Sequence, residues 1–303
     1  MDKVTAGYDQ LTRFWLDTAP ARGVVARLET SLLSALQHHD YPPRVSSLLR
    51  QLAGAALLLA CNLKQQAKVI LQVQGSGMVP LLCVEATDTL TYRLYASVRE
   101  NASLPDDAGL SDLVAPDGRG RFVLTIAPTN GQMYQGIVAL GNGSIASMLE
   151  EYLSNSQQSQ TRLWLREDGE VLEAMLLERT PDQAGVEATP AWIDAVAQAE
   201  NVFAQHFMPF PYEEWLQFSF AGHDVKVQPA QALRFECPCS IERVHNALKL
   251  VGEKELLPLL EEQGHIATRC EFCGKAYQVN AAQLSELFRN RDAAHPPVPN
   301  TIQ

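Results

Sequence analysis

Four of the six cysteines in this 303-residue chain lie in two close pairs. Cys237 and Cys239 are separated by one proline, while Cys270 and Cys273 enclose two residues and are followed by Gly274. Four sulfur donors in two close pairs are what a tetrahedral zinc site uses, with Zn–S bonds of about 2.3 Å. In the Cys-x-x-Cys-Gly half, the turn directs both sulfurs inward and the glycine lets backbone N–H groups approach them. We therefore predict one zinc ion (Zn2+) per reduced chain, bound by these four thiolates.

Three other interpretations of the same residues stay open at the level of spacing. His245 or His265 could replace one cysteine as a ligand, the cysteines could already form two disulfides, or the zinc could be purely structural. A Cys-x-Cys disulfide closes a small, strained ring, which makes it an oxidising couple rather than an inert crosslink. Zinc also keeps the sulfurs as thiolates, the form that peroxide or hypochlorous acid attacks. Both properties suit a redox switch, but spacing alone does not separate a switch from a structural site.

The composition describes a folded, acidic protein. Hydrophobic residues make up 46% and charged residues 19% of the chain, which allows a packed core and argues against wholesale disorder. Lys and Arg number 24 against 35 for Asp and Glu, a formal net charge of −11. A surface this acidic argues against nucleic acid or a membrane surface as the main partner, because neither offers a cationic face.

Two observations predict a cytoplasmic location. The longest apolar stretch, residues 52–63, is too short to span a bilayer, and the N-terminal run lacks the basic start and apolar stretch of a secretory signal. Thiols stay reduced in the cytoplasm, so six cysteines there indicate metal or redox chemistry before structural disulfides. Cys61 and Cys83 lie outside the two pairs in apolar surroundings, and we expect both to be small core residues.

Residues 1–180 are expected to form an α+β domain in which helices are segregated from antiparallel sheets. Helical periodicity predicts helices over residues 24–36, 44–63 and 144–155. Alternating apolar residues between turn residues predict strands over residues 67–73, 80–85, 89–98, 121–127, 133–140, 161–166 and 171–177.

Residues 181–233 are predicted to form a metastable helical linker. The segment carries seven acidic residues and one lysine, yet it is rich in large apolar side chains. Trp192, Val196, Ala199 and Phe203 recur at helical spacing and share one helix face. We expect such an acidic, amphipathic segment to fold only against a neighbouring part of the protein.

Residues 234–290 are predicted to form a small zinc-binding domain with helices over 241–250 and 253–262, followed by a disordered tail over 291–303. A domain of about 60 residues is too small for a self-sufficient core. It should therefore depend on its metal, because structural zinc contributes on the order of 10–16 kcal/mol in small peptides. Positive and negative charges nearly balance in this domain, which argues against nucleic acid as its ligand.

Several runs of residues resemble, in order, motifs of the thirty-three-kilodalton heat-shock protein family of redox-regulated holdase chaperones. The most specific runs, residues 235–240 and 269–277, contain the paired cysteines. Further matching runs cover nearly the whole chain: residues 9–14, 21–23, 39–42, 63–64, 71–75, 134–138, 151–153, 242–243 and 247–248.

The chain departs from the pattern of this family at three places in the N-terminal core. Gln157 stands in a run that usually reads Ser-Glu-Gln-x-Pro-Thr. Glu173, with Ala174 and Met175, replaces a Gly-Gly pair, and Leu94 follows Arg93 where the family pattern has Arg-Gly. We expect these changes to affect the N-terminal core and to leave the cysteines unaffected.

The resemblance implies a non-enzymatic function and a mechanism for it. Reduced, zinc-loaded members of the family are inactive. Oxidation forms a disulfide within each close pair, here Cys237 with Cys239 and Cys270 with Cys273, and releases zinc. The zinc domain and linker then unfold and expose apolar surface that holds unfolding client proteins without ATP, with the active form expected to be a homodimer. The linker residues expected to contact clients are Trp192, Val196, Phe203, Phe207 and Trp215.

Two rival functions would use the same cysteines. A thiol–disulfide oxidoreductase acting through Cys270 and Cys273 would need a thioredoxin-like βαβ context, which is not expected in the C-terminal region. A structural zinc-bearing module that binds proteins would need no redox chemistry. An ATP-driven chaperone is not expected, because the sequence contains no G-x-x-x-x-G-K-[ST] loop.

Overall fold

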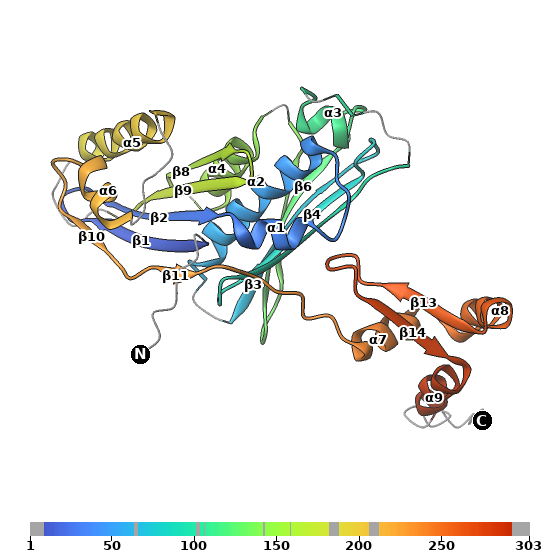
Figure 1. Cartoon of the computed structure of the whole chain (residues 1–303). Helices are drawn as coiled ribbons and strands as arrows, with labels where there is room; N and C mark the ends of the chain where they lie inside the picture. The colour runs from blue at the N-terminus through green and yellow to red at the C-terminus, as the bar shows by residue number, and fades with distance from the viewer. Residues whose placement is uncertain are drawn as a thin grey trace, which may run out of the picture. The chain divides into compact units, whose positions relative to one another are not determined.

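The computed structural model describes residues 9–63, 66–100, 104–105, 107–141, 143–157, 159–181, 188–205 and 212–292. The chain divides into two compact units, residues 1–236 and 237–303 (Figure 1). Helices and largely antiparallel sheets make up the described parts of both units, so the predicted α+β class is confirmed. Within the described ranges, every helix is too short or too polar to cross a bilayer.

The first sheet of the N-terminal unit has the strand order β10-β1-β2-β9-β8, and β11 also pairs with β1. All of these pairs are antiparallel. On β9, Glu173 lies opposite Arg27 of β2 on one side and opposite Arg166 of β8 on the other. The strands of this sheet are β1 (Gln10–Leu16), β2 (Ala21–Leu28), β8 (Thr161–Asp168), β9 (Val171–Arg179), β10 (Val225–Val227) and β11 (Gln231–Ala232).

The second sheet has the order β12-β5-β4-β3-β6-β7. Its pairs are antiparallel except the short parallel pairing of β12 with β5. Burial alternates strictly along β3, as its period-two sequence predicts. The strands are β3 (Ala67–Gln74), β4 (Leu81–Thr87), β5 (Thr91–Ser97), β6 (Arg121–Pro128), β7 (Tyr134–Ala139) and β12 (Arg234–Phe235).

The main core of this unit surrounds a long helix, α2 (Pro43–Ala60), which packs against strands of both sheets. A proline at the start of α2 suits the first helical turn, where no backbone donor is needed. Gly54 allows close approach to β9, because a Cβ there would lie 2.5 Å from Cδ2 of Leu172. Three shorter helices contribute side chains to the same core: α1 (Thr30–Leu36), α3 (Leu110–Val114) and α4 (Ile145–Gln157).

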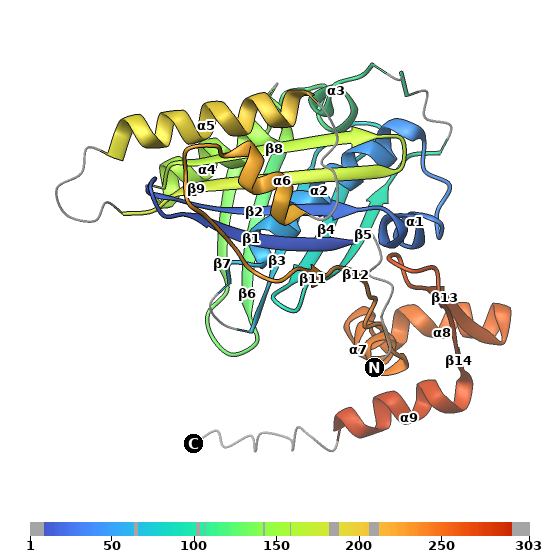
Figure 2. The same cartoon turned by 60° about the vertical axis from the view of Figure 1, so that its left-hand side comes forward.

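Two helices from the predicted linker cover the other face of the first sheet (Figure 2). They are α5 (Ala188–Gln205) and α6 (Tyr212–Ser219). Trp192, Ala199 and Phe203 of α5 are buried there, and Val196 packs at the edge of the same cluster. Sheet residues that share this second apolar cluster include Phe14, Leu16, Val25, Met175 and Leu177.

The C-terminal unit is small. Its described elements are α7 (Ile241–Val251), α8 (Glu253–Gln263), β13 (His265–Arg269), β14 (Ala276–Asn280) and α9 (Ala281–Asp292). Strands β13 and β14 pair as an antiparallel hairpin. The tail predicted over residues 291–303 overlaps the last two residues of α9, which are helical. Residues 293–303 lie outside the described part. The apolar cluster at the centre of this unit is formed by the buried residues Leu248, Leu256, Ile266, Val279, Leu284, Leu287 and Phe288.

The predicted helix over residues 24–36 is wrong in its first half. Residues 21–28 form β2, and only residues 30–36 are helical. Val24, Val25 and Ala26 are all buried, because apolar clusters cover both faces of the first sheet. A strand buried on both faces shows no alternation of apolar and polar residues. The apolar residues of β2 therefore matched helical spacing when read together with those of α1, and this led to the wrong prediction.

Candidate metal centre

The four paired cysteines come together in the C-terminal unit. Cys237 and Cys239 lie in the extended segment just before α7, whose N-cap is Ser240. Cys270 and Cys273 lie in the turn that joins β13 to β14. Their four sulfur atoms all lie within 4.8 Å of one another. The predicted clustering of the two pairs is therefore present in the structure.

The turn of the second pair is held by its own backbone. The N–H of Cys270 donates to the carbonyl oxygen of Lys275 at 3.0 Å, and the N–H of Gly274 donates to that of Cys270 at 2.8 Å. Gly274 has a φ of 66°, in the left-handed region that a side chain disfavours. The glycine thus lets the chain reverse immediately after the second sulfur, so that both sulfurs face the same space.

The spacing of the sulfurs suits a tetrahedral metal ion. Cys237 Sγ lies 3.6 Å from Cys270 Sγ, and Cys239 Sγ lies 3.4 Å from Cys273 Sγ. Sulfurs bound at about 2.3 Å around one zinc ion would lie about 3.8 Å apart, whereas disulfide-bonded sulfurs lie about 2.05 Å apart. Four soft donors at these separations fit zinc, and none of the four cysteines is joined to another in a disulfide.

Three of the thiols have acidities that are shifted by their surroundings. Burial alone would raise the pKa of Cys239, but the nearby Tyr277 hydroxyl and the other three cysteines outweigh it and lower this pKa to about 7. Burial, together with hydrogen bonding to its neighbouring cysteines, raises the pKa of Cys273 to about 12, and burial also raises that of Cys237. Binding a metal would displace the protons that these thiols otherwise retain.

The other candidate ligands are not part of this cluster. Within the described residues, the group able to hold a metal consists of the four cysteines, without His245 or His265. His265 Nδ1 lies 3.0 Å from the carbonyl oxygen of Gln263. Cys61 and Cys83 are buried in the N-terminal unit, and burial raises the pKa of each to about 11. Their predicted role as small core residues is confirmed.

The setting of the Cys-x-x-Cys pair differs from that of a thioredoxin-like site. Cys270 and Cys273 lie in a hairpin turn between two antiparallel strands, not between a parallel strand and a helix of a βαβ unit. Neither Cys270 nor Cys273 lies at the N-terminus of a helix, which is one of the means by which oxidoreductases lower a cysteine pKa. The alternative of a thiol–disulfide oxidoreductase therefore lacks its structural context here.

The candidate client-binding residues are mostly covered in this conformation. Trp192 is 8% and Phe203 5% exposed, and Val196 and Trp215 pack partly buried against the same cluster. Phe207 lies outside the described residues. Trp192 and Phe203 could offer their rings to another protein only after α5 leaves the sheet. The role of all five residues in binding clients stays a prediction.

Sequence reasoning missed the hairpin that carries the second cysteine pair, and with it Tyr277. Tyr277 and Val279 face inward on β14 while the residues between and beside them are exposed. This alternation over residues 276–280 is a period-two signal that could have predicted the strand. The strand matters for the candidate site because it places Tyr277 beside Cys239, whose pKa the tyrosine lowers.

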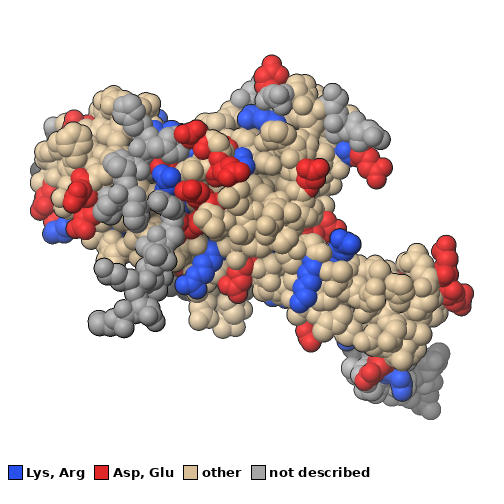
Figure 3. All heavy atoms as spheres, in the orientation of Figure 1, with Lys and Arg blue, Asp and Glu red and all other residues tan. Residues whose placement is uncertain are grey.

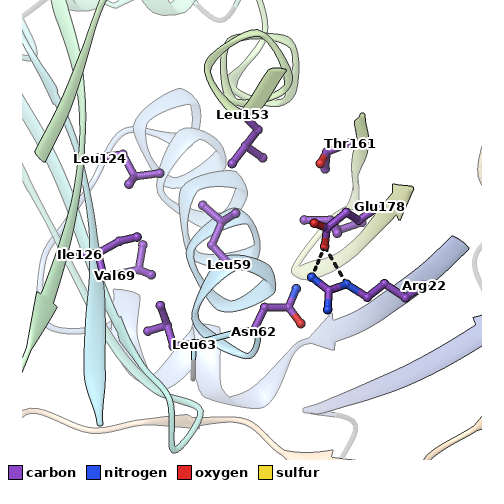
Figure 4. Close-up of a pocket in the computed structure, with 11 residues that line it drawn as sticks. Arg22, Leu59, Asn62, Leu63, Val69, Leu124, Ile126, Leu153, Thr161 and Glu178 are labelled. Atoms are coloured by element: carbon purple, nitrogen blue, oxygen red, sulfur yellow. Dashed lines mark hydrogen bonds and ion pairs between the residues drawn. The ribbon is translucent and has the colours of Figure 1, made fainter. Parts of the chain in front are cut away.

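A cavity of about 320 Å³ lies in the N-terminal unit, between the two sheets and the end of α2. Leu59 of α2, Leu63 just after this helix and Leu153 of α4 line its apolar part (Figure 4). Its polar rim includes Arg22, whose Nε and Nη2 donate to Glu178 Oε2 at 2.8 and 2.5 Å. Neither the paired cysteines nor the candidate client-binding residues line this cavity.

Charged side chains are interspersed on the face of the protein drawn in Figure 3. Basic side chains lie in ones and twos near acidic ones, and no broad basic area is visible on that face. This distribution accords with the net charge of −11. That nucleic acid and membranes are not partners stays a prediction.

Comparison with known proteins finds a family model and relatives that match most of the chain. A family model described as Hsp33 protein matches residues 9–280. A 33 kDa chaperonin of Methylobacillus flagellatus is 36% identical over 282 residues, covering 92% of this chain and 94% of that protein. A 33 kDa chaperonin of Hahella chejuensis is also 36% identical, over 281 residues that cover 92% of this chain and 97% of that protein.

A solved structure shares the fold. The crystal structure of a 33 kDa chaperonin, a heat shock protein 33 homologue from Thermotoga maritima, superposes with a TM-score of 0.76 at 17% sequence identity. The match covers 94% of this chain and 99% of the other. At this identity the likeness concerns the architecture alone, and it extends over both compact units.

Proposed function

This chain belongs to the Hsp33 family, and we propose from that membership that it is a redox-regulated holdase. In this role it would bind unfolding proteins during oxidative stress without using ATP. The name chaperonin, carried by its relatives, supports a chaperone role, which is not enzymatic. The observation that carries the redox part is the cluster of four sulfurs within 4.8 Å in a unit with a very small core.

The proposed switch is a four-electron oxidation of the metal site. One sulfur–sulfur bond forms between Cys237 and Cys239 and another between Cys270 and Cys273. Each bond releases two electrons, which with two protons reduce one molecule of hydrogen peroxide to two molecules of water. The zinc ion is released because its four thiolate ligands no longer exist. Its charge does not change in this reaction.

Loss of the metal would remove the main support of the C-terminal unit. Only seven apolar residues are buried in its described core, whereas structural zinc contributes on the order of 10–16 kcal/mol in small peptides. The two disulfides would close very short loops, which restrict the unfolded chain little and cannot replace that contribution. We therefore expect the oxidised unit to unfold.

The linker would follow because it is an amphipathic segment with little structure of its own. Helices α5 and α6 bury their apolar side chains against the first sheet. Their release would expose both those side chains and the sheet face beneath them, including Phe14 and Met175. Acidic residues of the linker, such as Asp194 and Glu200, would keep the opened protein soluble.

The decisive experiment treats the reduced, zinc-loaded protein with peroxide at mildly raised temperature, or with hypochlorous acid. Zinc release and aggregation of a thermally unfolding client are followed in the same sample. We expect zinc release and suppression of aggregation to rise together. A matched control is the Cys61→Ala, Cys83→Ala double variant, which should respond like the natural protein. Full zinc loss with unchanged client aggregation would refute the switch and leave the metal site standing.

The same sample tests the assembly. We propose that the oxidised form is a homodimer in the cytoplasm, with client proteins as its partners. Light scattering coupled to size-exclusion chromatography, before and after oxidation, should show a doubling of mass in the active form. A monomeric protein that still suppresses aggregation would contradict the dimer and leave the holdase role intact.

A further inference from the structure

A buried carboxylate lies beneath the linker helices, at a position where the chain departs from the family pattern. The side chain of Glu173, on β9, is 0% exposed. Its Oε1 accepts from Arg27 Nη1 at 3.2 Å, and its Oε2 accepts from Arg166 Nη2 at 2.6 Å. The three residues lie directly opposite one another on adjacent strands, so the pleat of the sheet directs all three side chains to the same face.

This face is the one that carries the linker. Met175 and Leu177, which alternate with Glu173 along β9, pack in the apolar cluster beneath α5 and α6. Leu172 and Ala174 point the other way, into the core around α2. The carboxylate and its two arginines, here called the Glu173 cluster, therefore belong to the interface between the sheet and the linker.

Arg166 connects the cluster to the end of α5. Its Nη1 donates to the carbonyl oxygen of Phe203, in the last turn of the helix. The guanidinium carbon also lies 4.7 Å from the centre of the Phe203 ring. A cation at a helix C-terminus pairs with the negative end of the helix dipole, and its stacking on the ring adds a cation–π contact. One arginine thus holds both the backbone and the side chain of Phe203.

The first residue of α6 lies against the same cluster. Tyr212 is 2% exposed, and the nearby charges of Glu173 and Arg27 act on its hydroxyl in addition to burial. Phe203 and Tyr212 are on the last turn of α5 and at the first position of α6. The cluster therefore lies against the C-terminal end of α5 and the N-terminal end of α6.

We propose that the Glu173 cluster is a latch that holds the linker helices on the sheet independently of zinc. Glu173 neutralises two arginines that would otherwise repel each other in a buried site, and it positions Arg166 to hold Phe203. Because neither the latch nor its contacts involve the C-terminal unit, release of the linker would require the latch to open as well as the metal to leave. This inference rests on the proposed function for its consequence but not for its geometry.

The direct test is hydrogen exchange in the reduced, zinc-loaded Glu173→Gln variant. The amide keeps the shape of the side chain but removes the charge, so Arg166 loses its carboxylate partner in the cluster and Arg27 keeps the ion pair with Glu29 at 3.3 Å. We expect amides of α5 and α6 to exchange at least about ten-fold faster, while amides of α2 and the zinc content stay unchanged. Unchanged exchange in α5 and α6, or an equal rise in α2, would overturn the latch.

Two controls remove other charges close by. Glu178→Gln breaks the ion pair with Arg22, which joins the same strands on the opposite face of the sheet (Figure 4). Glu200→Gln breaks an exposed ion pair between Arg162 of β8 and α5. Neither should accelerate exchange in the linker helices, since the first lies away from them and the second is solvent-screened.

A second variant keeps the test decisive if Glu173→Gln does not fold. Arg166→Lys retains a positive charge beside Glu173 but cannot also reach the carbonyl oxygen of Phe203 and stack on its ring. Faster exchange confined to α5 and α6 would support the latch, and wild-type exchange in a folded variant would overturn it. Client aggregation is measured in parallel after oxidation, when the metal has left. If exchange accelerates but the oxidised variant does not suppress aggregation, the latch stands and the linker's proposed role in binding clients fails.

Discussion

In the proposed metal centre each cysteine would provide a quarter of the ligand set, and the described structure places no other histidine, cysteine or carboxylate in the cluster to replace it. His245 and His265 are outside the cluster in the described structure. Replacing one thiolate by a hydroxyl therefore removes a ligand without a substitute. The residues of this site are consequently the ones for which a single substitution should have the largest effect.

The first residue-scale prediction concerns zinc affinity. Cys270→Ser should weaken zinc binding by at least about 100-fold, because a neutral hydroxyl is a poor ligand for zinc compared with a thiolate. Competition with a chromogenic chelator measures the affinity. Cys83→Ala, which removes a cysteine remote from the cluster, serves as the control and should bind zinc normally. Equal affinity in the Cys270→Ser variant would refute the four-sulfur site.

The two remaining cysteines allow a prediction about pH. Burial raises the pKa of Cys61 and Cys83 to about 11 from an ordinary value of 9.0. Their contribution to stability is complete below pH 9 and is lost as the pH rises toward 11, where the unfolded state releases its protons first. At pH 8 both should resist alkylation in the folded unit. Mass spectrometry should find four labelled cysteines after zinc is chelated and six after denaturant, and labelling of either buried cysteine without denaturant would contradict this.

Residues whose chemistry allows few roles were predictable from sequence. The paired cysteines were identified because metal coordination restricts both residue type and spacing. Tyr277 and Glu173 were not predicted as functional, because a tyrosine and a glutamate are common on any surface. Only the register of the strands places the first beside Cys239 and buries the second between Arg27 and Arg166.

At the scale of elements, the turn between β13 and β14 should be sensitive to its backbone. Gly274→Ala places a side chain at a φ of 66°, which costs roughly 1–2 kcal/mol. We expect zinc affinity to fall by about 5- to 30-fold and the absorption spectrum of a bound Co2+ probe to change, because the sulfurs of Cys270 and Cys273 shift.

The control for this prediction is Gly264→Ala at the C-cap of α8. It imposes a similar strain at a φ of 73° in the same unit, with open space around the new side chain. This variant should lose stability but keep the Co2+ spectrum of the natural protein. Identical spectra and affinities for Gly274→Ala and the natural protein would show that the turn does not set the site.

Several elements with one face toward solvent were predictable. Strand β3 and helices α4, α7 and α8 were placed from periodicity, with small differences at their ends. Helix α2 was also placed, although most of its residues are buried. Strands β1 and β2 were not, because their residues are buried on both faces or nearly so, and an unbroken apolar run carries no period. Short strands such as β10 to β12 owe their existence to pairing partners far along the chain, which no local pattern reports.

For the whole molecule, the two compact units should respond differently to removal of zinc. Chelating zinc from the reduced protein should abolish hydrogen-exchange protection in β13, β14 and α7, because seven buried apolar residues cannot stabilise that unit alone. Protection in α2 and β3 should persist, since the core of the N-terminal unit is large and contains no metal ligand.

The same samples give the control. Restoring zinc before oxidation should restore protection in the C-terminal unit, whereas magnesium should not, because thiolates are poor ligands for magnesium. A metal-free C-terminal unit that retains wild-type protection would contradict the dependence of this unit on zinc. The expected four-part division of the chain, with a linker between a core and a zinc domain, would then lose its physical basis.

The two halves of the sulfur cluster stand at opposite ends of a segment that contains α7, α8 and β13. The proposed oxidation joins only the two cysteines within each close pair. Rebuilding the four-sulfur site, in contrast, requires the entire segment between the pairs to refold before the two pairs meet. Closing so long a loop has an entropic cost that the forward step does not have. In the proposed switch, activation would thus be a local chemical event and inactivation would be a folding reaction. The cycle should show hysteresis: the protein would stay in its oxidised, active form for some time after the oxidant has been removed.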